Sequence, residues 1–119
     1  MGLDQFVFYY IGRKPNSKTN FKNNDEKELF HWRKHYKLDE WMFDLYQQKG
    51  GTKTFNSQKV WLSQKDILDL KNEILNNNFF DDEWELEDNE EQKVEDLDFC
   101  NKALEKIEQR YQIYYTNWW

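Results

Sequence analysis

The stretch spanning residues 28–46 constrains the fold more than any other part of the chain. Its apolar residues recur at intervals of three and four, the spacing of one face of an amphipathic helix. They are Leu29, Trp32, Tyr36, Leu38, Trp41, Met42, Leu45 and Tyr46. Asp25, followed three residues later by Glu28, indicates a capping box, and Gly50-Gly51 supplies a stop. We expect one amphipathic helix that organises the core, with a break allowed near residues 36–37.

Two strands and a second helix are predicted around this stretch. Residues 3–11 are nearly continuous apolar and aromatic, which indicates a strand buried on both faces and central in its sheet. Residues 59–62 are typical of a short strand, and Ser63 with Asp66 caps the helix that follows. The apolar face of that helix consists of Ile67, Leu70, Ile74 and Leu75.

The C-terminal part repeats the alternation of helix and strand. Residues 92–110 show helical periodicity through Leu97, Cys100, Leu104 and Ile107. Residues 111–119 are β-prone by composition and predict a last strand alongside the first. The order of elements predicts an α+β fold, a small sheet with helices packed on one face, in a single domain over residues 1–119.

The composition is rich in rings and poor in aliphatic residues, with six Trp, seven Tyr and nine Phe. Each buried ring removes roughly 150–250 Å² from water, so a few of them build a core and others remain for a binding surface. The single cysteine, Cys100, excludes an internal disulfide and fits a reducing compartment. No apolar run approaches the ~20 residues of a membrane span, and the start shows no signal-peptide pattern. We expect a soluble, cytoplasmic protein.

The net charge of −6 hides a strong asymmetry along the chain. Residues 1–37 carry eight Lys or Arg against four Asp or Glu, whereas residues 79–98 carry eleven acidic residues against one lysine. A chain with two such poles can bind anions at one end and imitate them at the other.

The basic pole contains a candidate nucleotide site. A nucleotide needs a ring on which its base stacks and a planar cation for its phosphate. The candidate ligand-binding residues are Arg13, Lys14, Trp32, Arg33, Lys34, Tyr36, Tyr115 and Trp118. The alternative is that Trp32 belongs to the core and Arg33 pairs with carboxylates, because adjacent helix residues point about 100° apart.

The acidic pole contains a candidate partner-binding segment. Its residues are Asp81, Asp82, Glu83, Trp84, Glu85, Glu87 and Asp88. Only Trp84 and Leu86 are apolar between residues 81 and 91, which suggests a short edge strand or an extended loop. Carboxylates spaced along an extended strand resemble the phosphates of a nucleic acid, and Trp84 adds an apolar anchor. The alternative is a solvated segment that keeps the protein soluble.

No pattern in the sequence indicates catalysis or a cofactor. His31, His35 and Glu28 have a spacing that binds a metal from one helix face, but no further ligand is evident, so we interpret both histidines as solvated. There is no Gly-rich phosphate loop and no nucleophile motif. The terminal Trp118-Trp119 pair forms either a self-association surface, which would make a homo-oligomer, or folds back onto the core.

Several short motifs resemble those of a family of small tailed-phage proteins. They are the opening Met1-Gly2-Leu3-Asp4, the run Trp32-Arg33-Lys34 with Leu38 and Trp41, the Val60–Ser63 segment, Phe79-Phe80 and the closing Tyr114–Trp118. The sequence departs from the family at Gln5-Phe6, Tyr36 and Asp39. The resemblance implies phage origin and no established reaction. It favours a non-catalytic protein that counters host defence by sequestering a signalling nucleotide or, alternatively, by blocking a host defence protein.

Overall fold

The computed structural model of the chain describes residues 2–11, 26–80 and 82–118. These residues form four strands and three helices. In chain order they are β1 (Asp4–Ile11), β2 (Glu26–Arg33), α1 (Tyr36–Gln48), β3 (Val60–Leu62), α2 (Gln64–Leu75), α3 (Leu86–Glu108) and β4 (Tyr111–Trp118). Among them no helix has both the length and the apolar composition needed to cross a membrane.

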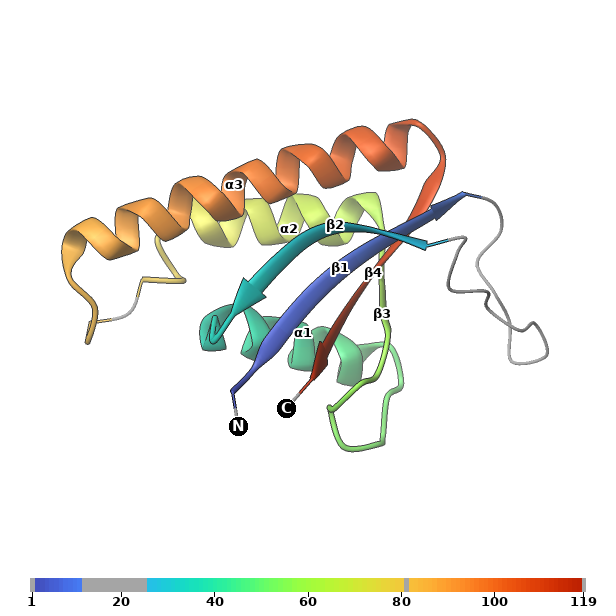
Figure 1. The fold of residues 1–119 in the computed structure, drawn as a ribbon, viewed down its shortest axis with the longest axis horizontal. Helices are drawn as coiled ribbons and strands as arrows, with labels where there is room; N and C mark the ends of the chain where they lie inside the picture. The colour runs from blue at the N-terminus through green and yellow to red at the C-terminus, as the bar shows by residue number, and fades with distance from the viewer. Residues whose placement is uncertain (1, 12–25, 81, 119) are drawn as a thin grey trace.

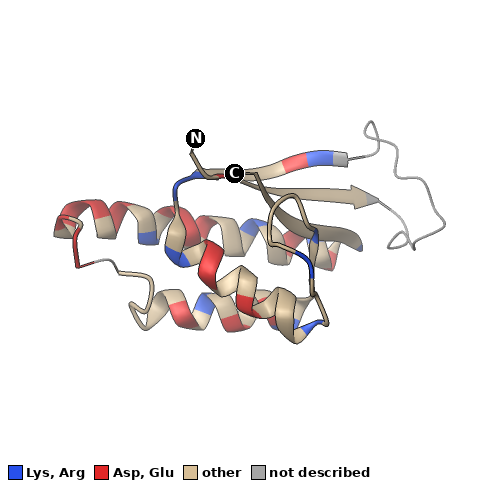
Figure 2. Cartoon of the chain, turned by 90° about the horizontal axis from the view of Figure 1, so that it is seen from below, with Lys and Arg blue, Asp and Glu red and all other residues tan. Residues whose placement is uncertain are grey.

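The strands form one antiparallel sheet in the order β2-β1-β4-β3 (Figure 1). All three helices lie on the same side of this sheet, and no described helix covers the other side (Figure 2). The α+β class is therefore confirmed, with helices on one face. β1 is central, as predicted, and pairs along its whole length with the C-terminal strand β4.

The sequence around α2 folds as its local signals predict. The Ser63 side chain accepts a hydrogen bond from the backbone N–H of Asp66, and the Asp66 carboxylate accepts one from the backbone N–H of Ser63. This reciprocal capping box fixes the first turn of the helix. Ile67, Leu70 and Ile74 are buried, whereas Leu75 remains half exposed.

The prediction of one continuous helix over residues 28–46 is wrong for its first part. Residues 26–33 form strand β2, and the helix α1 begins only at Tyr36. A bulge places Leu29 between the pairs Val7↔Phe30 and Phe8↔Glu28, so apolar residues point to the core at intervals other than two. The bulge explains the three-residue spacing from Leu29 to Trp32, which resembles that of a helix. Pairing with the central strand β1 overrides this local pattern.

The break between β2 and α1 is made by two residues. Lys34 adopts a left-handed conformation with φ 59°, and its N–H donates to the carbonyl of Leu3 at 2.8 Å. His35 then becomes the N-cap residue of α1. The chain therefore turns sharply after Arg33, and residues on the two sides of the turn face different directions.

The helix α3 begins six residues before the predicted start. Residues 82–85 form a turn, and Leu86 already belongs to the helix. The prediction of an edge strand or extended loop is therefore wrong for residues 86–91. Glu87 and Asp88 occupy the first turn, where carboxylates interact favourably with the positive end of the helix dipole.

Candidate functional site

The sheet has two faces of different character. On β1, Gln5 and Val7 point toward the helices and are fully buried. Phe6, Phe8 and Tyr10 alternate with them and point to the side that no described helix covers, because successive side chains of a strand face opposite ways. We call this side the open face. The prediction that β1 is buried on both faces is therefore wrong for this side, where Phe6, Phe8 and Tyr10 are partly exposed.

A row of rings crosses the open face from β2 to β3. His31 stacks on Phe6 with ring centroids 4.8 Å apart, and Phe6 lies 5.8 Å from Phe8. Phe8 lies 5.6 Å from Tyr114, and Tyr114 lies 5.0 Å from Trp61. Phe6, Phe8 and Trp61 are partly exposed, whereas Tyr114 is buried beneath its neighbours. We refer to these five residues as the ring row.

Charged side chains flank the ring row. Asp4 lies opposite Arg33 on one side and Trp118 on the other, so the three side chains share the open face. The Arg33 side chain is 70% exposed, with Nε 4.0 Å from Asp4 Oδ1, and His31 Nε2 lies 3.6 Å from the same oxygen. At the β3 side, the Lys59 ammonium lies 5.1 Å from the centre of the Tyr114 ring. Cations and rings are thus within reach of one another.

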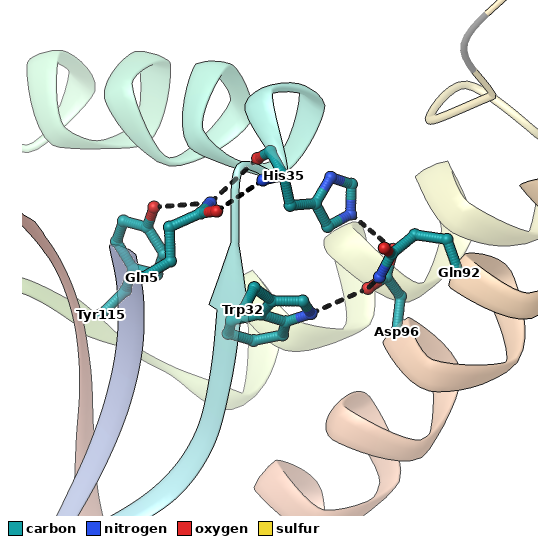
Figure 3. A network of polar contacts seen from close by, with 6 residues as sticks. All are labelled: Gln5, Trp32, His35, Gln92, Asp96 and Tyr115. Atoms are coloured by element: carbon teal, nitrogen blue, oxygen red, sulfur yellow. Dashed lines mark hydrogen bonds and ion pairs between the residues drawn. The ribbon is translucent and has the colours of Figure 1, made fainter. Parts of the chain in front are cut away.

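The helix-covered face contains a buried polar network around Asp96 of α3 (Figure 3). Asp96 Oδ1 accepts hydrogen bonds from Trp32 Nε1 at 3.0 Å and from Gln92 Nε2 at 2.9 Å. Its Oδ2 is 2.7 Å from His35 Nε2. Trp32 belongs to β2, His35 is the N-cap residue of α1, and Gln92 lies one turn before Asp96 on α3. One carboxylate therefore joins β2, the start of α1 and α3.

A second part of the network is centred on Tyr115 of β4. Gln5 exchanges two hydrogen bonds with the backbone of His35 and donates a third to the Tyr115 hydroxyl at 3.0 Å (Figure 3). The hydroxyl in turn donates to Asp39 Oδ1 at 2.6 Å, and Asn117 Nδ2 donates to the same oxygen at 2.8 Å. Burial and the Asp39 carboxylate raise the pKa of Tyr115. This network links β1, β4 and α1.

The part of the network around Asp96 has the geometry of a structural contact. Among the described residues, every buried side-chain nitrogen or oxygen has a hydrogen-bond partner. His35 and Asp96 are 2% and 1% exposed, and the cavity beside Asp96 has a volume of about 10 Å³, room for at most one water. Burial and Asp96 raise the pKa of the Cys100 thiol to about 12. The cavity beside Asp96 is therefore too small for a substrate.

The structure separates the residues predicted for the nucleotide site. Trp32 and Tyr115 point toward the helices, 3% and 0% exposed, so the prediction that they line a ligand pocket is wrong, and the core alternative holds for Trp32. Arg33 and Trp118 lie on the open face. The other four do not join them there: Lys34 lies in the turn after β2, Tyr36 is exposed at the start of α1, and Arg13 and Lys14 lie outside the described residues.

The two histidines also lie in different environments. His31 is exposed on the open face, whereas His35 is buried, which contradicts the prediction that both are solvated. They belong to a strand and a helix cap, so Glu28, His31 and His35 do not share a helix face. In the part of the chain that the structure describes, no group of three His, Cys, Asp or Glu side chains is arranged to hold a metal ion.

The acidic segment lies at the surface. Asp81 is outside the described residues, but the other members of the predicted segment are exposed, namely Asp82, Glu83, Trp84, Glu85, Glu87 and Asp88. Because α3 begins at Leu86, the extended-strand spacing of carboxylates does not apply to Glu87 and Asp88. Leu86 and Val94 on the same helix are 69% and 68% exposed. The pole is therefore an acidic surface with apolar side chains within it.

Comparison of the chain with protein-family models, with curated proteins and with solved structures finds no match.

Proposed function

We propose that the chain is a non-catalytic binding protein that captures a nucleotide on the open face of its sheet. The observation that supports this is the ring row with Arg33 at its end. Phe6 and Phe8 are partly exposed, and Phe6 is already stacked between His31 and Phe8. A base would therefore extend the ring row at one of its ends, where stacking on an aromatic ring contributes ~1–3 kcal/mol per base. The guanidinium of Arg33 provides a planar donor for phosphate.

The distribution of charge is consistent with an anion on this side. Most Asp and Glu residues lie on the helices, on the far side of the sheet (Figure 2). Around the ring row, the two cationic residues Arg33 and Lys59 balance the charge of the two acidic residues Asp4 and Glu28. An anion therefore meets far less repulsion there than over α3. The resemblance to small tailed-phage proteins directs the choice of ligand toward a host-made signalling nucleotide, held away from its receptor.

A thermal-shift titration tests this function. Cyclic dinucleotides and ADP-ribose-type nucleotides are added to the purified protein, and a ligand at a hundredfold excess over its Kd adds about 2.7 kcal/mol of stability. We expect Arg33→Gln to weaken binding tenfold or more, because a hydrogen bond to a charged group contributes roughly 1.5–3 kcal/mol. The matched control is Lys65→Gln on α2, whose side chain is 83% exposed. No rise in Tm with any nucleotide, or equal effects of the two variants, would remove the proposal.

A second candidate function is supported by the exposed acidic surface at the start of α3. Here the protein would block a basic host defence protein, with Trp84, Leu86 and Val94 as apolar contacts among the carboxylates. The neutral changes Asp82→Asn, Glu83→Gln and Glu85→Gln should then abolish salt-sensitive capture of a basic partner.

The matched control for that experiment changes the same number of charges elsewhere. Asp44→Asn, Asp69→Asn and Glu108→Gln alter exposed acids on the three helices. Capture that is lost equally with both triple variants would reflect net charge alone, and capture that survives the first set would exclude this function.

A further inference from the structure

A cavity of about 460 Å³ lies between α1 and the segment that follows it, away from the ring row. Three rings line it, from Phe43 and Tyr46 of α1 and from Phe55. Phe43 and Tyr46 each lie close to Phe55, with centroids 5.5 and 5.1 Å apart. The volume falls within the range of about 300–1,000 Å³ that small-molecule sites occupy.

One carboxylate at the wall of this cavity has an oxygen that its own protein leaves unused. Asp39 is 7% exposed and lines the cavity. Its Oδ1 accepts from both Tyr115 and Asn117, and no hydrogen bond or ion pair to Oδ2 occurs among the described residues. Since no fully buried side-chain oxygen in that part of the chain lacks a partner, Oδ2 retains access to solvent. Because Asp39 lines the cavity, solvent reaches Oδ2 through the cavity.

The rest of the lining has the chemistry of a cation site. Glu40 follows Asp39 on the cavity wall, and Lys53 is the one cationic residue among the described lining residues. Lys53 is exposed, and its backbone N–H donates to the Tyr46 hydroxyl at 3.1 Å. Aromatic faces attract cations through their quadrupole, most strongly where water is excluded. A half-used, desolvated carboxylate beside three rings therefore favours a ligand with an N–H-bearing positive charge and an apolar body.

We propose that this cavity binds a small organic ammonium ion, which donates an N–H to Asp39 Oδ2 and places its apolar body against Phe43 and Phe55. The site is separate from the open face and does not depend on the nucleotide proposal. Burial raises the pKa of Asp39 despite the hydrogen bonds from Tyr115 and Asn117, and a bound cation would offset that burial.

Isothermal titration calorimetry with 2-phenylethylamine tests the proposal, with 2-phenylethanol as the matched neutral compound. The amine should bind at least tenfold more tightly than the alcohol. Equal affinities, or no heat from the amine at millimolar concentration, would overturn the proposal. A capped lysine tests a protein side chain as the source of the ammonium, and tighter binding of that compound would overturn the assignment to a small molecule.

Two isosteric variants separate the specific carboxylate from general charge. Asp39→Asn keeps an oxygen for Tyr115 and Asn117 and replaces the cavity-facing oxygen with an NH₂ donor, so amine affinity should fall tenfold or more. Glu40→Gln makes the same charge change at the adjacent, exposed residue and should reduce affinity threefold at most. Equal losses would overturn the role of Asp39.

A third variant keeps the test decisive if Asp39→Asn does not fold. Phe43 is 37% exposed, so Phe43→Ser leaves the core in place while removing one wall of the cavity. We expect amine affinity to fall at least fivefold in this variant. Unchanged affinity would show that the amine binds elsewhere.

Discussion

The two faces of the sheet are both aromatic, but their rings are held in different ways. On the helix-covered face, Trp32 and Tyr115 place their polar atoms on buried carboxylates. On the open face, Phe6 and Phe8 carry no polar atoms and contact one another and their neighbours through their flat surfaces. The comparison shows that a high ring content serves two purposes here. One set of rings fixes the core, and the other remains within reach of a ligand.

The largest effect should come from the carboxylate that joins three elements on the covered face. Asp96→Ala leaves Trp32 Nε1, Gln92 Nε2 and His35 Nε2 without their acceptor. We expect a loss of at least about 3 kcal/mol in the free energy of unfolding, because removing one partner of a buried polar cluster strands the others. Urea denaturation measures this loss.

The control for this change lies two residues further on α3. The Asp98 side chain is 54% exposed and pairs with Lys102 at 3.1 Å, an interaction of roughly 0.3–0.5 kcal/mol. Similar losses for Asp96→Ala and Asp98→Ala would contradict the structural role of the network.

Tyr115→Phe and Phe6→Leu change one ring on each face of the sheet, and both should lower the free energy of unfolding by less than Asp96→Ala. Removing the Tyr115 hydroxyl breaks its bonds with Gln5 and Asp39 and should cost about 1–3 kcal/mol. Phe6→Leu removes stacking with His31 and Phe8, worth about 0.5–1.5 kcal/mol. Nucleotide affinity should fall for Phe6→Leu alone, as measured by thermal shift. A fall for Tyr115→Phe alone would reverse the assignment of the faces.

The pH dependence of stability should differ in sign between two carboxylates of the helical layer. Burial raises the pKa of Asp39 above 3.8, so this group destabilises the fold as pH rises through that pKa. Burial also opposes ionisation of Asp66, but hydrogen bonds from Lys49 and Ser63 outweigh it and lower its pKa. Asp66 therefore contributes stability above pH 3.8 that is lost as pH falls through the lowered value.

Asparagine variants measured by urea denaturation at pH 3 and pH 7 separate these signs. From pH 3 to pH 7, the destabilisation caused by Asp66→Asn should grow. Over the same range, the destabilisation caused by Asp39→Asn should shrink or turn into stabilisation. Changes in the same direction for both variants would show that the two carboxylates have similar environments.

The smallest effect on stability should come from Trp118 at the edge of the open face. Its side chain is 65% exposed, so Trp118→Ala should change the free energy of unfolding by no more than about 0.5 kcal/mol. Size-exclusion chromatography with light scattering then tests self-association, one of the two alternatives predicted for the terminal tryptophans. An oligomer of the wild type that persists in the variant would exclude Trp118 from the interface.

Local signals in the sequence predicted much of the fold and little of the site. The Ser63–Asp66 capping box and the apolar run of β1 identified their elements because each depends on neighbours in the chain. The helical spacing around Trp32 misled, since the strand there is imposed by pairing with β1 and by a bulge. The open face could not be predicted from five consecutive apolar or aromatic residues, Phe6 to Tyr10, because such a run does not say which side the helices cover.

The polar sites around Asp96 and Asp39 could not be predicted from the sequence for a related reason. Asp96 looked like one of eleven acids in an acidic segment, and only the tertiary fold brings Trp32 and His35 to it. Asp39 likewise acquires its partners from β4, more than seventy residues away in the chain.

The indole N–H signals in a ¹⁵N–¹H NMR spectrum test the account most directly, because the six tryptophans include reporters of both faces. On titration with a binding nucleotide, the signals of Trp61 and Trp118 on the open face should shift with ligand concentration. The signal of Trp32, whose Nε1 donates to Asp96, should stay in place. A shift of the Trp32 signal with Trp61 and Trp118 unmoved would contradict the assignment of binding to the open face.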